Sequence, residues 1–141
     1  MPLGPYILIA LSCIGLADTA FLSYFAYLNA VPGCAIGGCE VVLTSAYSKF
    51  LGVPLAYIGL VYYVYMLALA GLLALDARSK VLSGAAVLYT AVGFLLSLYY
   101  EFYIQSVLIG HYCMYCAISA LTALALFGVA IWHWRSTPRR T

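Results

Sequence analysis

The chain has 141 residues, of which 67% are hydrophobic and only 7% are charged. Water-soluble domains carry roughly 25% charged residues, so this composition excludes a soluble globular domain. Six Lys and Arg residues against four Asp and Glu residues leave no basic face for a nucleic acid. The high apolar content also excludes an intrinsically disordered chain. The composition therefore predicts a one-domain integral membrane protein.

Four stretches of the sequence are long and apolar enough to cross the roughly 30 Å hydrocarbon core of a bilayer as helices. They cover about residues 6–28, 53–75, 81–104 and 113–134, and they leave a loop over residues 29–52. Pro54 is expected in the first turn of the second helix, where proline is tolerated. The runs are continuously apolar rather than alternating, which excludes a transmembrane β-barrel. The predicted fold is all-α, an integral membrane bundle of four transmembrane helices.

Five of the six basic residues flank the helices on one side of this predicted bundle. Arg78 and Lys80 lie between the second and third helices and three arginines follow the fourth, whereas Lys49 lies in the 29–52 loop. Because four spans return the chain to the side where it began, the positive-inside rule predicts that both termini are cytoplasmic. The 29–52 loop and the start of the fourth helix then lie on the outer face of the cell membrane.

Four of the five cysteines fall on this outer side, in two pairs. Cys34 and Cys39 lie in the loop, and Cys113 and Cys116 form a Cys-x-x-Cys sequence at the start of the fourth helix. The outer compartment is the one in which disulfides persist. Cys13 lies in the cytoplasmic half of the first helix and has no predicted partner, so we expect a small apolar packing residue there.

The Cys-x-x-Cys pair stands where a thiol gains reactivity. Unpaired N–H groups and partial positive charge at a helix N-terminus stabilise a thiolate relative to a thiol. The thiolate is the nucleophile of thiol–disulfide exchange. Glycines around Cys34 and Cys39 keep the loop flexible enough to close a disulfide ring and reopen it. The four cysteines therefore favour a membrane enzyme that exchanges disulfides and passes electrons into the bilayer.

Two non-enzymatic alternatives use the same four cysteines. Two structural disulfides would staple the outer surface of a scaffold or channel subunit. Four thiolates with this spacing could also hold a zinc ion, provided that the compartment keeps them reduced. The position of the second pair at the mouth of a transmembrane helix favours electron transfer over both, and no metal ligand is predicted.

Several sequence segments occur in a specific order and spacing: Gly15-Leu16-Ala17-Asp18, Phe21-Leu22-Ser23-Tyr24, the Cys34/Cys39 pair, Val41-Val42-Leu43-Thr44-Ser45-Ala46-Tyr47-Ser48, Leu51-Gly52-Val53-Pro54-Leu55-Ala56-Tyr57-Ile58-Gly59-Leu60 and Cys113-Met114-Tyr115-Cys116. In this arrangement nearly the whole chain resembles the vitamin K epoxide reductase family in its short prokaryotic form. The resemblance implies a four-helix bundle around a quinone pocket. It also implies an enzyme that oxidises a thioredoxin-like dithiol protein and reduces a membrane quinone of menaquinone or ubiquinone type, in support of disulfide bond formation.

The resemblance assigns a role to each paired cysteine. Cys34 would take the partner into a mixed disulfide, Cys39 would exchange with Cys113, and Cys116 would face the quinone. The chain contains no thioredoxin-like domain, so we expect the partner to be a separate protein. The reverse direction, from a quinol outward, stays open as an alternative. Ala120 stands where some members have a quinone-binding Tyr, a departure that weakens the expectation of epoxide reduction more than that of quinone reduction and leaves vitamin K epoxide open as a substrate.

A few polar side chains are expected to orient the quinone in an otherwise apolar pocket. Besides Cys116, the candidates are Ser45, Ser48, Tyr112 and Ser119. The apolar residues between Val41 and Leu51 further predict a short surface helix that caps the bundle and closes the pocket.

Three ionisable residues could pass protons during quinone reduction, namely Asp18, Glu101 and His111. An unpaired charge inside a membrane is costly, so Asp18 is expected to be neutral or hydrogen-bonded. A structural hydrogen bond between helices is the favoured role for Asp18, with proton relay as the alternative. Glu101 and His111 are predicted near the outer mouth of the bundle, close to the Cys113/Cys116 pair.

Overall fold

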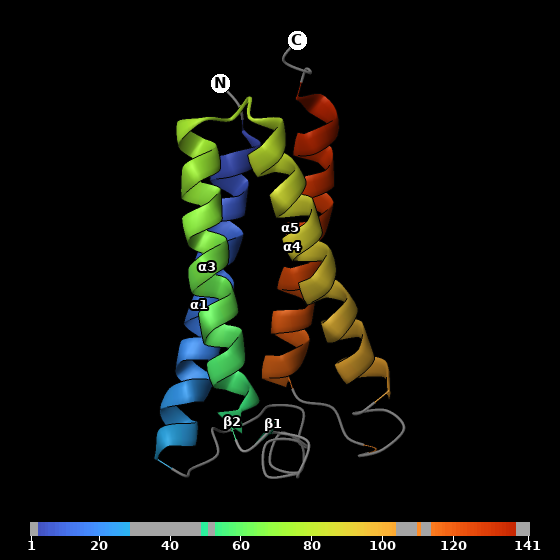
Figure 1. The fold of residues 1–141 in the computed structure, drawn as a ribbon. Helices are drawn as coiled ribbons and strands as arrows, with labels where there is room; N and C mark the ends of the chain where they lie inside the picture. The colour runs from blue at the N-terminus through green and yellow to red at the C-terminus, as the bar shows by residue number, and fades with distance from the viewer. Residues whose placement is uncertain (1–2, 29–48, 51–52, 104–109, 111–113, 138–141) are drawn as a thin grey trace.

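The computed structural model describes residues 3–28, 49–50, 53–103, 110 and 114–137. Within these ranges four long helices run up and down the bundle: α1 (Gly4–Tyr27), α3 (Leu55–Leu75), α4 (Lys80–Leu98) and α5 (Met114–Ser136). Figure 1 shows them side by side as a bundle. Each is long and apolar enough to cross a membrane, with the third span continuing to Tyr103 through a wider π-type turn over residues 99–103. The predicted all-α bundle of four membrane helices is confirmed.

The start of the second span differs from the prediction. Val53–Pro54 form the short strand β2, which pairs antiparallel with β1 (Lys49–Phe50), and α3 begins only at Leu55. Pro54 therefore precedes the helix instead of lying in its first turn. Proline is tolerated here because it ends a two-residue edge strand, where its missing N–H leaves no ladder bond unmade. The predicted surface helix lies outside the described residues except at Lys49 and Phe50, which are extended rather than helical.

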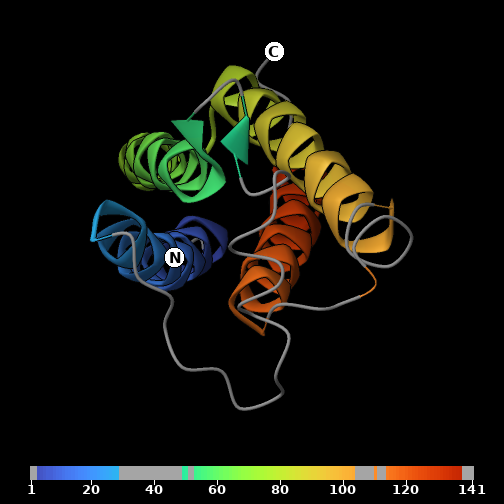
Figure 2. The same ribbon diagram turned by 90° about the horizontal axis from the view of Figure 1, so that it is seen from below.

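The four helices do not pack equally with one another. Among the described elements, α1 packs extensively against both α3 and α5, α4 packs along α5, and the contact between α3 and α4 is the smallest of these. Seen along the bundle, α1 and α3 form one adjacent pair and α4 crosses α5 in the other (Figure 2). Helix α1 is thus the element that joins α3 to α5.

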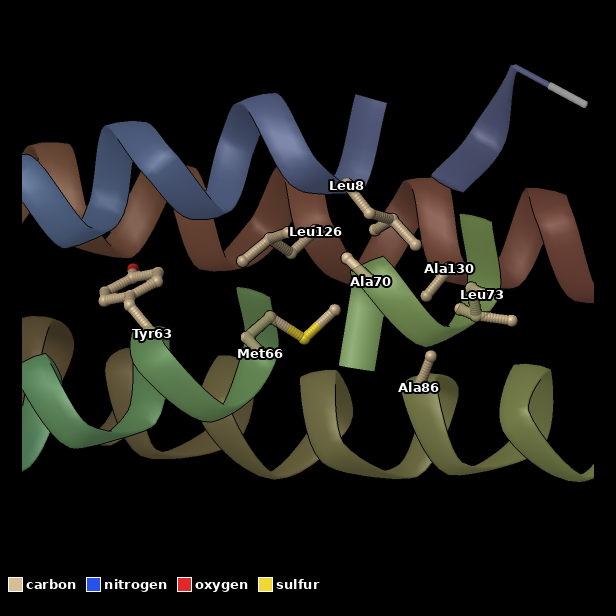
Figure 3. Packing of buried hydrophobic residues seen from close by; sticks show 8 residues of the cluster. All are labelled: Leu8, Tyr63, Met66, Ala70, Leu73, Ala86, Leu126 and Ala130. Atoms are coloured by element: carbon tan, nitrogen blue, oxygen red, sulfur yellow. The ribbon is translucent and has the colours of Figure 1, made fainter. Parts of the chain in front are cut away.

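The buried core is a thin layer between these helices, and Figure 3 shows its residues. It consists of Leu8, Tyr63, Met66, Ala70, Leu73, Ala86, Leu126 and Ala130. Three of the eight are alanines, because close approach of helix backbones inside a membrane depends on small residues at the interface. Large apolar side chains such as Leu88, Leu95 and Leu121 are exposed on the outer surface of the bundle, as expected for a lipid-facing surface.

Most of the polar side chains on the buried faces form hydrogen bonds to the backbone of their own helix. Five hydroxyl groups donate to the carbonyl oxygen four residues earlier, at 2.7–2.9 Å: those of Ser12, Thr19, Thr90, Thr122 and Thr137. A hydroxyl that bonds in this way costs little in an apolar environment, since neither partner needs water.

The end of the bundle that carries both chain termini is closed by His133. Its ring is 6% exposed, its Nε2 lies 3.0 Å from the carbonyl oxygen of Ala77, and a Cβ built on Gly4 would lie 2.7 Å from its Nδ1. The ring therefore touches the start of α1 and the turn between α3 and α4. The β1–β2 pair and the first turn of α5 lie at the opposite end (Figure 1). An even number of spans accounts for termini on the same side.

Candidate functional site

Cys116 is the predicted catalytic residue that the structure describes. It is the third residue of α5 and is partly buried at the end of the bundle opposite the termini. Cys34, Cys39 and Cys113 lie outside the described residues, and so do three of the predicted quinone-orienting residues, Ser45, Ser48 and Tyr112. The predicted His111 also lies outside them, whereas Glu101 lies in the π-type turn that follows α4.

Aromatic contacts fix the first turn of α5 against the last turns of α1. The rings of Tyr115 and Phe21 have centroids 5.4 Å apart, and Phe21 in turn lies 4.8 Å from Phe25. Tilted aromatic pairs at such separations stabilise a contact beyond the area that they bury. Cys116 therefore stands on a helix end that is held by packing to α1.

One turn deeper in α5, Ser119 is hydrogen-bonded to Tyr63 of α3. The Tyr63 Oη lies 3.0 Å from the Ser119 carbonyl oxygen and 3.1 Å from its Oγ. The hydroxyls of four other helical residues donate to their own helix, whereas that of Ser119 bonds to a different helix. Residues three apart on a helix are neighbours, with about 5–6 Å between their Cβ atoms, so this bond meets α5 one turn deeper than Cys116.

Tyr63 reaches the centre of the bundle because α1 has a glycine there. Its side chain is only 2% exposed and is directed from α3 toward α1 and α5 (Figure 3). A Cβ on Gly15 would collide with the Cδ1, Cε1 and Cζ atoms of the Tyr63 ring. Any larger residue at position 15 would displace the ring and with it the bond to Ser119.

Asp18 borders the same junction from α1. Its Oδ2 is buried and has no hydrogen-bond partner among the described residues. The carboxyl group is close enough to Tyr63 to interact with it electrostatically. The helix-to-helix hydrogen bond that the sequence favoured for Asp18 is therefore not found in the described part of the chain. A buried carboxylate oxygen without a partner is costly in a membrane, so Asp18 is a candidate functional residue.

Cys13 does not have the position that the sequence suggested. Its side chain is exposed on the outer surface of α1 rather than packed between helices. The prediction was wrong because the residues of α1 that face the bundle recur at Leu8, Ser12, Gly15, Thr19 and Leu22, and position 13 falls on the opposite side.

Sequence reasoning missed Tyr63, although it predicted Ser119 and considered Asp18. Tyr63 is one of 14 tyrosines and stands in an apolar run with Tyr62 and Tyr65, so no local signal marks it. Only its contact with a glycine from a distant segment distinguishes it. The signal that could have pointed to it is Gly15, a small residue in a span where a neighbouring helix can approach closely.

The described side chains around Cys116 suit an apolar ring with polar edges. The aromatic rings of Phe21 and Tyr115 supply flat apolar surface, and Tyr63, Ser119 and Asp18 supply hydrogen-bonding atoms. The buried Oδ2 without a partner shows that this polar capacity is not used up within the described chain. A quinone has this character, with an apolar ring and two carbonyl oxygens, so the residues present fit such a group.

These features define a multi-pass membrane protein in which Cys116, in the first turn of a span, lies one helical turn from a buried polar junction. The sequence of residues 6–131, which is most of the chain, matches the family model of the vitamin K epoxide reductase family. The chain therefore belongs to the vitamin K epoxide reductase family. It is also 34% identical over 121 residues to the thiol-disulfide oxidoreductase LTO1 of Arabidopsis thaliana.

That match covers 81% of this chain but 32% of the plant protein, so the chain spans about a third of its relative's length. The family and the relative together support, in general terms, a membrane thiol oxidoreductase.

Proposed function

We propose that this protein is a quinone-dependent thiol oxidoreductase that takes electrons from a thioredoxin-like dithiol protein. In this proposal Cys34 attacks or is attacked by the partner, Cys39 exchanges with Cys113, and Cys116 delivers the electron pair. The relay would support disulfide bond formation outside the cell. Family membership and the name of the plant relative support the thiol chemistry.

The observation that carries the proposal is the position of Cys116 in the first turn of a membrane-spanning helix, above the Tyr63–Ser119 bond. A helix N-terminus favours a thiolate, and the thiolate is the species that reacts. A thiol that served only as a surface staple would gain nothing from a polar junction beneath it. A residue that passes electrons to a group dissolved in the bilayer needs such a position.

A bound quinone would supply an acceptor for two electrons and two protons. The chain's own residues would bind and orient it: Phe21 and Tyr115 through their rings, and Ser119 through its hydroxyl. Ser45, Ser48 and Tyr112 are further candidates for the same task. The donor cysteines lose two S–H bonds and gain one S–S bond in each turnover, so the thiols themselves balance the protons that the acceptor takes up.

The proposed orientation places both termini in the cytoplasm and the four paired cysteines on the outer face of the cell membrane. Both termini lie at the same end of the bundle, in agreement with an even number of spans. The excess of basic residues at that end indicates that it faces the cytoplasm. An outer position of the cysteines matches the compartment in which a disulfide-forming relay works.

The test is anaerobic reduction of a soluble quinone analogue by the purified protein, with a reduced thioredoxin-like protein as donor. Wild type is compared with Cys116→Ala and with Cys13→Ala, a matched control because Cys13 faces outward on α1. We expect quinone reduction in wild type and in Cys13→Ala, and its loss in Cys116→Ala.

Equal rates in wild type and Cys116→Ala would overturn the proposed function. Stoichiometric zinc in the purified protein would then support a metal site, and cysteines that resist mild reductants would support structural disulfides.

A further inference from the structure

In the Tyr63–Ser119 pair, Ser119 is the member that retains surface for a ligand. The Tyr63 side chain is only 2% exposed, so protein encloses it almost completely. Ser119 is partly buried, and the two hydrogen bonds that join the residues are likewise only part-buried. A ligand near the first turns of α5 can therefore contact Ser119, and Tyr63 can influence that ligand through Ser119.

The hydroxyl of Tyr63 has two partners in one residue. Its Oη lies 3.0 Å from the carbonyl oxygen of Ser119 and 3.1 Å from the Oγ, and either oxygen can be the donor between the two hydroxyls. Each hydroxyl carries one hydrogen and accepts through its lone pairs. While Tyr63 donates to the carbonyl oxygen, the Ser119 hydrogen is free either to bond to the Tyr63 Oη or to turn toward a ligand. Neither choice leaves the Tyr63 hydrogen without an acceptor.

Ser119 differs in its hydrogen bond from the other hydroxyls inside this bundle. Thr122, one turn further along α5, donates to the carbonyl oxygen of Ile118, four residues earlier, at 2.8 Å. Hydroxyls on α1 and α4 bond to their own helix in the same way. The partner of the Ser119 Oγ in the described part of the chain is instead Tyr63 of α3. Tyr63 therefore holds the Ser119 hydroxyl away from the backbone of its own helix.

The two oxidation states of a quinone make opposite demands on such a hydroxyl. A quinone carbonyl oxygen only accepts hydrogen bonds, whereas a quinol hydroxyl, like that of tyrosine, also donates one. Ser119 must give its hydrogen to a quinone, but it can keep that hydrogen on Tyr63 while it accepts from a quinol. The Tyr63–Ser119 pair meets both demands by rotation of the Ser119 hydroxyl hydrogen alone.

We propose that Tyr63 is a positioning residue that holds the Ser119 hydroxyl in place for both oxidation states of the quinone. Ser119 donates to a carbonyl oxygen of the quinone, and it accepts from the quinol while its own hydrogen bonds to Tyr63. No covalent bond forms or breaks in this rearrangement, because only a hydroxyl hydrogen rotates. The inference rests on the proposed function, since it requires a quinone next to Ser119.

The test measures dissociation constants of quinone and quinol by anaerobic equilibrium dialysis with the full-length protein in detergent. Duroquinone and dimethylnaphthoquinone are the probes, one for each candidate type of quinone, and methyl groups protect their ring positions from thiols. All proteins carry Cys116→Ser, so that the probe and the protein do not exchange electrons. Tyr63→Phe removes a hydroxyl but keeps the ring beside Gly15, and Ser119→Ala removes the hydroxyl proposed to meet the probe.

We expect each single variant to bind its probe about threefold to tenfold more weakly, which corresponds to one hydrogen bond. In Tyr63→Phe the cause is release of the Ser119 hydroxyl, which is then free to bond to its own helix. The double variant should therefore bind the probe like Ser119→Ala alone. Thr122→Val is the matched control and should leave binding unchanged, because the Thr122 hydroxyl already donates to Ile118.

Two results would overturn the positioning role while the proposed function stands. One is unchanged affinity in Tyr63→Phe. The other is a loss in the double variant equal to the product of the two single losses, since Tyr63 would then act independently of Ser119. Absence of binding of both probes would also overturn the inference. Together with absence of quinone reduction by the wild-type protein, it would mark failure of the proposed function itself.

Infrared spectroscopy supplies a second measurement that leaves Tyr63 unchanged. The carbonyl stretching band of the bound quinone should lie below that of the same quinone in an apolar solvent, and it should move back in Ser119→Ala. Reduction of the bound quinone should shift a tyrosine C–O stretching band, because the Tyr63 oxygen then accepts a hydrogen bond from Ser119. This shift should be lost in Ser119→Ala. A tyrosine band that does not respond to reduction would contradict the proposal even if Tyr63→Phe fails to fold.

Discussion

The hydroxyl of Tyr63 lies 3.1 Å from that of Ser119, although α3 and α5 each pack mainly against other helices. This bond crosses the centre of the bundle and meets α5 one turn from Cys116. The bond fixes the rotation of α5 about its own axis close to Cys116, where the chemistry is proposed. The bond therefore links packing in the middle of the membrane to the geometry of a thiol near its edge.

The Tyr63–Ser119 bond should contribute measurably to stability. Interhelical hydrogen bonds in membrane proteins contribute about 0.6 kcal/mol on average and up to roughly 2 kcal/mol. A double-mutant cycle with Tyr63→Phe and Ser119→Ala, followed by unfolding in detergent, should give a coupling free energy in this range. Tyr65→Phe is the control, because Tyr65 is exposed on the lipid-facing side of α3. Strictly additive effects of the two changes would contradict the bond between the two hydroxyls, which is the part of the contact that Ser119→Ala removes.

Gly15→Ala should destabilise the bundle. The added Cβ would meet ring atoms of Tyr63, which cannot bend away as a flexible side chain would. Overpacking of this kind costs about 1–3 kcal/mol. Gly128→Ala is the matched control, since a Cβ there meets nothing within 4 Å. Thermal unfolding should show a clearly lower unfolding temperature for Gly15→Ala and little or no change for Gly128→Ala. Equal effects would argue against the Tyr63 contact.

The two tyrosines that join α3 to α4 should contribute unequally. Tyr62 and Tyr89 stack with ring centroids 4.7 Å apart, and each hydroxyl points at the carbonyl oxygen of the other residue. The Tyr89 bond is 2.8 Å long and the Tyr62 bond 3.5 Å, at the limit for a hydrogen bond. Tyr89→Phe should therefore lose about 1 kcal/mol of stability and Tyr62→Phe much less. The reverse order in chemical unfolding would refute this geometry.

His133→Ala should loosen the terminal end of the bundle without changing Cys116. The substitution removes the partner of the Ala77 carbonyl oxygen and empties the space beside Gly4. The hydrogen bond is only part-buried, so its loss should cost about 0.5–1.5 kcal/mol. We expect a lower unfolding temperature, partial recovery in His133→Gln, and wild-type alkylation of Cys116 at the opposite end. Slowed alkylation in His133→Ala would show that the two ends are coupled.

The helices themselves were predictable because membrane crossing is a local property. Each apolar run must satisfy its backbone within itself, so its length and composition fix a helix wherever it occurs. The described helix ends lie within two residues of those expected, except that α4 passes into a π-type turn after Leu98. Pro54 is an exception of another kind, because it joins a strand pair. That exception depended on pairing with Lys49 and Phe50, which no pattern within the apolar run could indicate.

The candidate site was predictable only in part. The Cys-x-x-Cys motif marked Cys116, and its neighbour Ser119 followed from sequence proximity. Cys13 was placed wrongly because the apolar stretch of α1 gives no clear indication of which face meets the bundle. Tyr63 was not predicted from the sequence, since aromatic side chains occur both on surfaces that face lipid and on surfaces that face protein.

The sequence alone determined that the chain is a four-span membrane protein with cysteine pairs in a family-specific order. These features follow from hydropathy, charge counts and spacing, each of which acts along the chain. Only the tertiary structure decided that the Tyr63 ring packs against Gly15, that Tyr63 bonds to Ser119, and that Asp18 retains a buried oxygen without a described partner. The reason is physical: lipid and protein are equally apolar, so the rotation of each helix is set by close contacts between distant segments rather than by hydrophobicity.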